Sequence, residues 1–224
     1  MSKQATSRWQ ERAVTAPVAT ARERALTQSL KFVQAALELL GESDRADLTV
    51  TEVVERAGVS LRTFYQRFGS KDELMLAVLE ESQHYGRDLR QAALDAASDP
   101  HERLRMAVSG LLAEVPPHAR SRRAALAREN LRLAQMYPEE IQQLAEPTIE
   151  LLTHEIERGI AAGLVRDDDP RALALMVYHL TSAHMVASLL ETVDTKRSPL
   201  DAEQIGQFIL RALRPDPTPP TPTR

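Results

Sequence analysis

The stretch TVTEVVERAGVSLRTFYQRFGSKDEL, residues 49–74, contains the signals that decide the fold. Residues 49–52, Thr-Val-Thr-Glu, have the spacing of a capping box, in which two side chains satisfy free amides at the start of a helix. Gly58 is expected to end that helix, and Ser60 can cap the next one, which runs to about Phe68. Neither short helix is stable alone, so both must pack on another element.

Helical periodicity extends over the chain on either side of this stretch. Downstream, residues 70–73, Ser-Lys-Asp-Glu, form a second capping box, which opens a long helix toward Ala97. Upstream, one apolar stripe recurs at steps of three and four residues and predicts a first helix from about Arg22 to Leu40. The stripe consists of Leu26, Leu30, Val33, Leu37 and Leu40.

Prolines mark the later helices. A capping residue followed by Pro indicates a helix start. This pattern occurs at Asp99-Pro100, Asp169-Pro170 and Ser198-Pro199. Pro138 and Pro147 interrupt the middle of the chain, so the helix that ends near Gly163 is expected to start or kink at Pro147. The last two helices are expected at about 170–192 and 199–213, and no strand alternation is present, which predicts an all-α protein.

The composition is that of a soluble globular protein. Of 224 residues, 43% are hydrophobic and 27% are charged, and no apolar run approaches the roughly 20 residues that a membrane span requires. The N-terminal segment lacks the apolar core of a signal peptide, and the chain has no cysteine. We therefore expect a cytoplasmic protein. The net charge is −4, but residues 1–75 carry a slight basic excess, which permits a local DNA-binding face.

The helix expected after Ser60 has two different faces. Phe64 and Phe68 are four residues apart and share a face that can pack in a small core with the first helix. Arg62 and Gln66 are also four apart, on another face, and a polar face on a short helix suits the major groove of DNA. Arginine can hold guanine, and glutamine can hold adenine, through two hydrogen bonds each.

These residues suggest a set of DNA contacts, with Arg62 and Gln66 reading bases and with hydroxyls and Lys71 on phosphates. The full set is Thr49, Thr51, Ser60, Leu61, Arg62, Thr63, Tyr65, Gln66 and Lys71. Two alternatives stay open: Arg62 and Gln66 are solvated surface residues, or the whole stretch is a helical hairpin inside an ordinary all-α core. Arg22 and Arg24 either enter a minor groove or are simply solvated.

The ordering of these motifs resembles the TetR family of transcriptional regulators. The resemblance is carried by the capped helix, Ala-Gly-Val-Ser at 57–60, Thr-Phe-Tyr at 63–65 and Ser-Lys-Asp-Glu-Leu at 70–74. Ala-Gly-Val-Ser alone would be a weak signal, whereas the whole arrangement with this spacing is specific. It covers residues 49–74 closely and the preceding helix loosely.

Three positions depart from what is common in such proteins. The residue after the turn serine is often Lys and the next is often small, whereas here Leu61 and Arg62 stand there. Leu61 therefore either touches a thymine methyl or joins the local core. Gly69 replaces a common Pro.

The resemblance implies an N-terminal three-helix helix-turn-helix DNA-binding domain followed by a larger helical domain for ligand sensing and dimerisation. The expected boundaries are a flexible arm over 1–20, the DNA-binding domain over 21–70, the effector-binding and dimerisation domain over 71–213, and a disordered Pro/Thr-rich tail over 214–224. The expected function is ligand-responsive transcription regulation, most simply by a repressor that an effector releases from a palindromic operator. The alternative is a DNA-binding regulator controlled by a protein partner.

The second half of the chain has few aromatic residues, and this composition bears on the effector. From residue 75 onward they are Tyr85, Tyr137, Tyr178 and Phe208, so a small, largely apolar effector is favoured over a flat aromatic one. Each candidate lining residue can equally be ordinary core or surface. The candidates are Met106, Asn130, Met136, Tyr137, Met176, Tyr178, His179 and Met185.

Homodimerisation is expected through the last two helices. Residues 170–192 are apolar on more than one face, and residues 205–213 offer a second apolar surface. Two such helices from each of two chains would form a four-helix interface, which the resemblance also implies. The alternative is a buried helix within a monomer.

Enzymatic chemistry is disfavoured, and no catalytic residue, metal or cofactor is expected. His179 and His184 are five residues apart, not the four that would face one metal on a helix, and the acidic run 167–169 lacks the alternation and glycine of a calcium loop. The basic segment 120–128 is interpreted as a solvated helix face. An α-helical enzyme or carrier with an accidental hairpin remains a rival to the DNA-binding functions.

Overall fold

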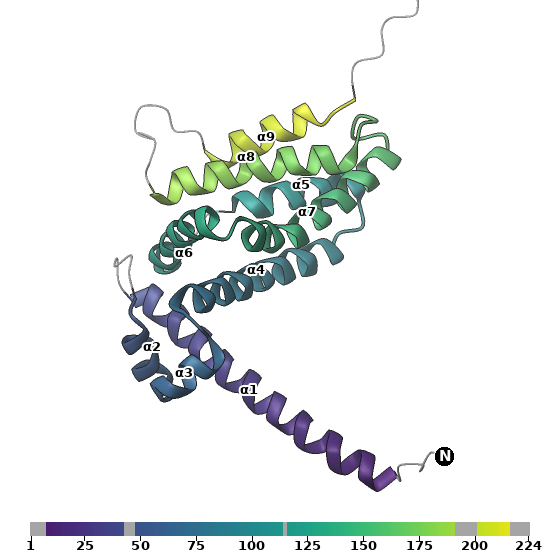
Figure 1. Ribbon diagram of the computed structural model, residues 1–224. Helices are drawn as coiled ribbons and strands as arrows, with labels where there is room; N and C mark the ends of the chain where they lie inside the picture. The colour runs from purple at the N-terminus through teal and green to yellow at the C-terminus, as the bar shows by residue number, and fades with distance from the viewer. Residues whose placement is uncertain (1–7, 43–47, 114–115, 191–200, 216–224) are drawn as a thin grey trace, which may run out of the picture. The chain divides into compact units, whose positions relative to one another are not determined.

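A computed structural model of the protein describes residues 8–42, 48–113, 116–190 and 201–215. Within these ranges the chain forms nine α-helices and no strand, so the predicted all-α fold is confirmed (Figure 1). The chain divides into two compact units, Met1–Val78 and Leu79–Arg224.

The first unit contains three helices and the beginning of a fourth. They are α1 (Arg8–Glu42), α2 (Val50–Ala57), α3 (Leu61–Arg67) and the first turns of α4 (Lys71–Asp95). Helices α2 and α3 pack on each other and on the C-terminal part of α1 (Figure 1).

The predicted caps are present at the start of α2 and α3. Thr49 Oγ1 accepts a hydrogen bond from the amide of Glu52 at 3.2 Å, and Glu52 Oε2 accepts one from the amide of Thr49 at 2.8 Å. Gly58 ends α2 with φ of 63°, a left-handed conformation that glycine adopts without a steric penalty. Ser60 Oγ then accepts from the amide of Thr63 at 3.1 Å, so the two helices are separated by a tight turn.

The start of α4 explains why glycine stands at position 69. Ser70 Oγ accepts from the amide of Glu73 at 3.1 Å, and the Glu73 carboxylate accepts from the amide of Gly69 at 2.7 Å. Proline has no amide hydrogen and could not make the second bond. A Cβ at position 69 would also lie 3.0 Å from Glu73 Oε1, so a side chain there would crowd the same carboxylate.

A cluster of aromatic rings holds the first unit together. Phe32 and Phe64 are fully buried, and their ring centroids lie 5.4 Å apart in an edge-to-face arrangement. Phe68 is also buried, with its centroid 6.2 Å from that of Phe32. Edge-to-face pairs add roughly 0.5–1.5 kcal/mol beyond the burial of area, so α3 is fixed to α1 by shape as well as by hydrophobicity.

Helix α1 differs from the prediction at both its start and its buried face. It begins at Arg8, inside the segment expected to be a flexible arm, because residues 8–13, Arg-Trp-Gln-Glu-Arg-Ala, are mostly good helix formers. Leu26 and Leu30 of the predicted stripe are 57% and 55% exposed. Val33 and Leu40 of the stripe are buried as predicted, and the buried face also includes Phe32.

The boundary between the units lies inside α4. Leu74, Met75 and Val78 are fully buried and belong to the first unit, so this unit extends beyond the residue 70 expected as its end. The predicted boundary at residue 70 was taken from the capping box that starts α4. The first two turns of α4 nevertheless belong to the first unit.

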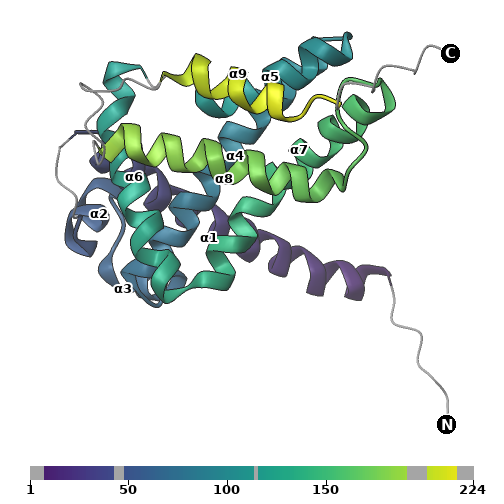
Figure 2. The ribbon, with the colours of Figure 1, turned by 90° about the horizontal axis from the view of Figure 1, so that it is seen from above.

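The second unit is a helical bundle with an aliphatic core. Besides the rest of α4 it contains α5 (Pro100–Leu112), α6 (Pro117–Met136), α7 (Pro138–Ala161), α8 (Pro170–Leu190) and α9 (Ala202–Ala212). Helix α8 packs on α7, α6 and α5, while α5 also packs on α9, and α8 and α9 lie side by side (Figure 2). Leu104, Leu152 and Val177 are among the buried residues where these helices meet.

Several predicted helix starts in the second unit are confirmed. Asp99 caps α5 by accepting from the amide of Glu102 at 3.0 Å, and α8 begins at Pro170. Pro147 was expected either to start a helix or to kink one. Helix α7 begins at Pro138 and passes through Pro147, so Pro147 does not start it. The cap expected at 198–199 lies outside the described residues, and α9 is capped by Asp201.

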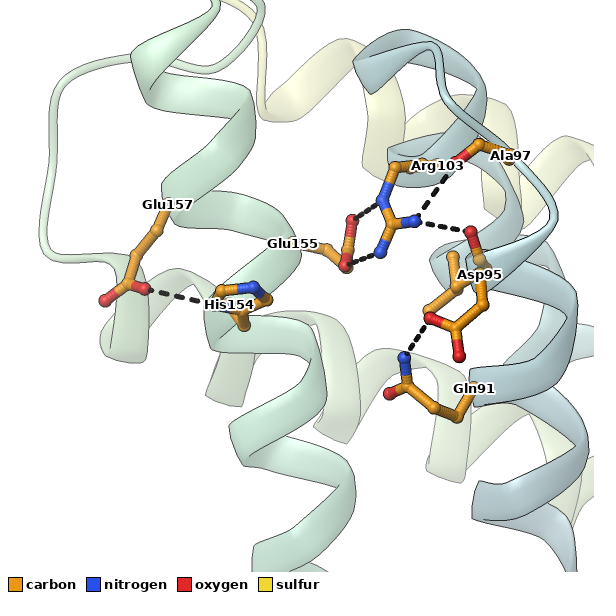
Figure 3. A network of polar contacts seen from close by, with 8 residues as sticks. Gln91, Asp95, Ala97, Arg103, His154, Glu155 and Glu157 are labelled. Carbon is orange, nitrogen blue, oxygen red and sulfur yellow. Dashed lines mark hydrogen bonds and ion pairs between the residues drawn. The ribbon is translucent and has the colours of Figure 1, made fainter.

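A buried ion pair joins α5 and α7. Arg103 and Glu155 are 7% and 3% exposed, and the guanidinium donates two hydrogen bonds to the carboxylate, from Nε at 2.9 Å and from Nη2 at 2.6 Å (Figure 3). Arg103 Nη1 also donates to the carbonyls of Leu94 and Ala97, at the end of α4. One side chain therefore fixes the ends of two helices to a third.

Among the described residues, α8 is long and apolar enough to cross a membrane by length and composition, so the expectation that no segment meets that criterion is wrong. Packing in the bundle explains part of the apolar character of α8. Leu173, Ala174 and Val177 are buried in the core of the second unit.

Candidate functional site

Helix α3 presents a polar face above its buried aromatic face. Arg62 and Gln66 are exposed, and Tyr65 is 57% exposed with its ring edge-to-face on Phe64. Leu61 is 48% exposed, so it lies on the surface and does not join the local core. Guanidinium, amide and phenol groups are thus displayed together on one short helix, as direct reading of base edges in a major groove requires.

The predicted phosphate contacts lie on α2, α3 and α4. Ser60 and Thr63 lie at the start of α3, and their hydroxyls are hydrogen-bonded to each other at 2.8 Å. Thr51 is exposed in the first turn of α2, where Thr49 donates its hydroxyl to Glu52 at 2.8 Å. In the protein without DNA, the hydroxyls of Thr49, Ser60 and Thr63 take part in hydrogen bonds at the helix starts. The exposed Thr51 hydroxyl is available to contact a backbone phosphate.

Lys71 is half-buried in the first turn of α4. The described residues of the predicted DNA set therefore lie along α3 and at the starts of α2 and α4. Helix starts offer unpaired amides as well as side chains, and both bind anions such as phosphate.

Two polar contacts position α3 and α2 against α1, and sequence reasoning did not identify either of them. Arg67 Nε and Nη2 donate to Gln28 Oε1 at 3.1 and 2.9 Å, which fixes the end of α3. Arg56 donates to both carboxylate oxygens of Glu42 at 2.8 and 2.7 Å. The hydrogen bond from Arg56 lowers the pKa of the Glu42 carboxyl. Their only sequence signal is a polar residue near the end of each short helix.

The proposed ligand-lining residues of the second unit differ in how deeply they are buried. Met106 and Tyr178 are partly buried and pack on its aliphatic core. Met136 and Met176 are 56% and 57% exposed, and His179 is exposed as well. The structure therefore places these three on the surface of the second unit.

The remaining candidates are half-buried. These are Asn130, Tyr137 and Met185. Tyr137 forms the junction between α6 and α7, where its amide donates to the carbonyl of Leu133 at 2.7 Å. Met185 accepts a weak hydrogen bond at Sδ from Arg123 at 3.7 Å.

Sequence reasoning missed Arg90, a partly buried cation in the second unit. Its Nη2 donates to Thr148 Oγ1 at 3.3 Å, and its Nε is buried without a hydrogen-bond partner. Gly86 precedes Arg90 by one helical turn, so the two residues lie on the same face of α4. This glycine is the only feature of the sequence that indicates space for the Arg90 side chain.

Comparison with known proteins identifies the first unit. Residues 32–78 match the family model described as bacterial regulatory proteins, tetR family. A stretch of 75 residues, 33% of this chain, is 37% identical to the HTH-type transcriptional regulator BetI of Brucella canis. The match spans 37% of the length of that relative, so it concerns only part of each chain.

Solved structures match over most of the chain in fold. A putative transcriptional regulator from Saccharomonospora viridis in complex with choline covers 81% of this chain and 92% of its own, with 18% identity and a TM-score of 0.61. The transcriptional regulator FadR from Bacillus subtilis in complex with stearoyl-CoA covers 82% and 96%, with 16% identity and a TM-score of 0.55. At this level of identity the likeness concerns the fold alone.

Proposed function

We propose that this chain, which carries the DNA-binding domain of the TetR family, is a sequence-specific transcriptional regulator that responds to a small effector. The observation that carries the proposal is the polar face of α3, with exposed Arg62, Tyr65 and Gln66 over buried Phe64. No enzyme family is indicated by the comparisons. A regulator of bacterial genes acts where the chromosome lies, so a cytoplasmic location is part of the proposal.

Helix α3 is the element that reads the operator. Arg62 holds a guanine through O6 and N7, and Gln66 holds an adenine through N6 and N7. Leu61 contacts a thymine methyl, because its side chain is 48% exposed beside these two residues. The residues on phosphates are Thr49, Thr51, Ser60, Thr63, Tyr65 and Lys71. They fix the orientation of the helix but do not select sequence.

The protein acts as a homodimer through α8 and α9. Met176 and Leu180 on α8 and Phe208 on α9 are 57%, 46% and 61% exposed, although α8 and α9 lie side by side in one unit. Large exposed apolar side chains on adjacent helices are typical of a self-association surface. A two-fold dimer presents two copies of α3 and therefore requires an operator with two symmetric half-sites.

The effector binds the second unit, and the fold supports this part of the proposal because the two neighbouring structures each contain a small molecule. We expect a largely apolar molecule, since the core of the unit is aliphatic. The effector releases a repressor by binding a conformation that does not bind DNA. A shift from 1:99 to 99:1 requires about a 10⁴-fold preference, or about 5.5 kcal/mol.

Selection of bound duplexes from a random DNA pool at about 0.15 M salt tests the proposal, because this salt weakens contacts that involve phosphates alone. A two-fold symmetric motif is expected. Wild-type protein and Arg62→Ala are then compared on that motif and on a scrambled duplex. If no motif emerges even after cell extract is added to supply an effector, the DNA-binding function is refuted. If a motif emerges but only a protein fraction of the extract alters binding, the regulator is controlled by a protein partner.

A further inference from the structure

Arg90 of α4 contacts α5 and α7 in the second unit. Its Nη2 donates to Thr148 on α7, a residue that is 3% exposed. A Cβ at Gly110 on α5 would lie 3.4 Å from Arg90 Cγ, and a Cβ at Gly86 would lie 3.2 Å from Arg90 Nη1. The two glycines therefore give the arginine side chain its space, and the guanidinium lies between α4 and α7.

No carboxylate of the described residues is paired with Arg90, which distinguishes it from Arg103. Arg103 is the more deeply buried of the two, and Glu155 accepts two of its hydrogen bonds. Arg90 has a neutral hydroxyl on one nitrogen and a buried Nε that donates to no group in the described part of the chain. A desolvated cation without an anion is unfavourable, because burial removes hydration that nothing replaces.

The positive charge of Arg123 makes the burial of the Arg90 cation still more unfavourable. Burial lowers the pKa of Arg90, and the positive charge of Arg123 on α6 lowers it further. The guanidinium nevertheless stays protonated at neutral pH, so the region remains positive. Tyr178 on α8 also acts on Arg90 electrostatically, and its hydroxyl interacts with Ser182.

We propose that Arg90 binds the carboxylate of an anionic effector, with Nε and Nη2 as donors and with Thr148 and Tyr178 beside it. This inference rests on the proposed effector site in the second unit and names the chemical class of its ligand. A guanidinium edge with two parallel N–H groups matches a carboxylate, and such charge-assisted pairs are about twice as strong as neutral hydrogen bonds.

The neighbours of Arg90 define the rest of the ligand. Tyr178, which acts on Arg90 electrostatically, is partly buried against the aliphatic core, so the part of the effector beyond the carboxylate is apolar. Arg123 is exposed and reaches Met185 on α8, which places a second positive charge on the solvent side. A cationic ligand such as a quaternary ammonium is disfavoured, since two arginines would repel it and no described carboxylate compensates Arg90.

Thermal unfolding of the full chain without DNA tests the inference. The probes are sodium octanoate, 1-octanol, octylammonium chloride and sodium phosphate, each at about 1 mM and matched in ionic strength with sodium chloride. Octanoate should raise the Tm of the wild-type protein by about 3 °C or more, because a ligand that binds only the folded state stabilises it. Octanol, octylammonium and phosphate should have less than half of that effect.

Variants decide whether Arg90 is responsible. Arg90→Met should abolish the octanoate shift, and without any probe its Tm should equal or exceed the wild-type value, because a buried unpaired charge is removed. Arg90→Lys should retain part of the shift. Arg87→Gln changes an arginine on the same helix whose side chain is 38% exposed and paired with Asp88; it is the control and should respond as the wild-type protein does.

The inference is overturned by any of three results: no octanoate shift in the wild-type protein, an equal shift in Arg90→Met, or an equal shift with octanol. A lower Tm of Arg90→Met without probe would also overturn it, since Arg90 would then be structural. Operator binding is measured separately, so an octanoate shift in a protein that selects no DNA motif would refute the proposed function alone.

Discussion

Arg103 and Glu155 form a buried, doubly hydrogen-bonded ion pair whose arginine also closes the end of α4 (Figure 3). The hydrogen bonds with Glu155 raise the pKa of Arg103, so the guanidinium stays charged over the physiological range. Three helices, α4, α5 and α7, meet at this one side chain. Its removal should therefore affect the whole second unit and leave the first unit's contacts in place.

Loss of the carboxylate partner should destabilise the second unit strongly. Glu155→Gln leaves the Arg103 charge buried without a counter-charge, and we expect a loss of about 3–5 kcal/mol in the free energy of unfolding. Urea unfolding followed by circular dichroism measures this loss. Glu102→Gln, which removes an exposed carboxylate from its pair with Arg105, should change the value by less than about 1 kcal/mol.

An apolar replacement of the whole pair provides a sharper comparison. Arg103→Met combined with Glu155→Leu should be less destabilising than Glu155→Gln alone, because no unpaired charge remains. If the double variant is the less stable of the two, the arginine matters for its bonds to the backbone carbonyls at the end of α4.

The turn between α2 and α3 should tolerate asparagine but not alanine at position 58. Gly58 has φ of 63° with open space around a Cβ, so a substitution there changes backbone strain and no packing contact. Gly58→Ala should lower stability by about 1 kcal/mol or more, and Gly58→Asn by less, because asparagine enters the left-handed region more readily. Equal losses in both variants, measured by urea unfolding, would contradict this assignment.

Arg62 and Lys71 should differ in how they affect DNA binding. Arg62→Ala should cost about 1–3 kcal/mol at one operator position and relax the base preference there. Lys71→Ala should weaken binding to all sequences similarly and reduce the slope of affinity against salt. Fluorescence anisotropy with single-base variants of the selected operator measures both. Unchanged affinity and base preference in Arg62→Ala would remove Arg62 from the reading face.

Charge on the exposed apolar surface of α8 and α9 should dissociate the dimer. Leu180→Glu and Phe208→Glu each place a carboxylate at side chains that are 46% and 61% exposed, so the monomer fold should be kept. Sedimentation velocity should show a shift toward monomer, with weaker operator binding. Leu131→Glu on α6, where leucine is equally 46% exposed, is the matched control and should remain dimeric.

Local signals in the sequence were sufficient for the first unit. The capping residues, Gly58 and the spacing of Phe64 and Phe68 are short-range features, and each is found where it was predicted. The stripe on α1 was less informative, because periodicity cannot distinguish exposed Leu26 from buried Phe32 without knowledge of which helices lie opposite.

The second unit could be predicted only in outline. Its important polar residues act over long sequence distances, as Arg103 with Glu155 and Arg90 with Thr148 do. An arginine in a helical pattern is read as a solvated residue unless its partner is known. Pro147 was expected as a start or a kink, and α7 runs through it, which rules out the start; proline removes one helical bond but does not forbid a helix that tertiary packing stabilises.

Because the first turns of α4 lie in the core of the first unit, the DNA-binding head is not a module that ends where its motif ends. A fragment cut at residue 70 would lose Leu74, Met75 and Val78, three fully buried side chains of the first unit. Chimaeras that join this head to another regulator's body therefore need their crossover within α4, beyond Val78. In this chain the first turns of α4 therefore belong with the helix-turn-helix unit.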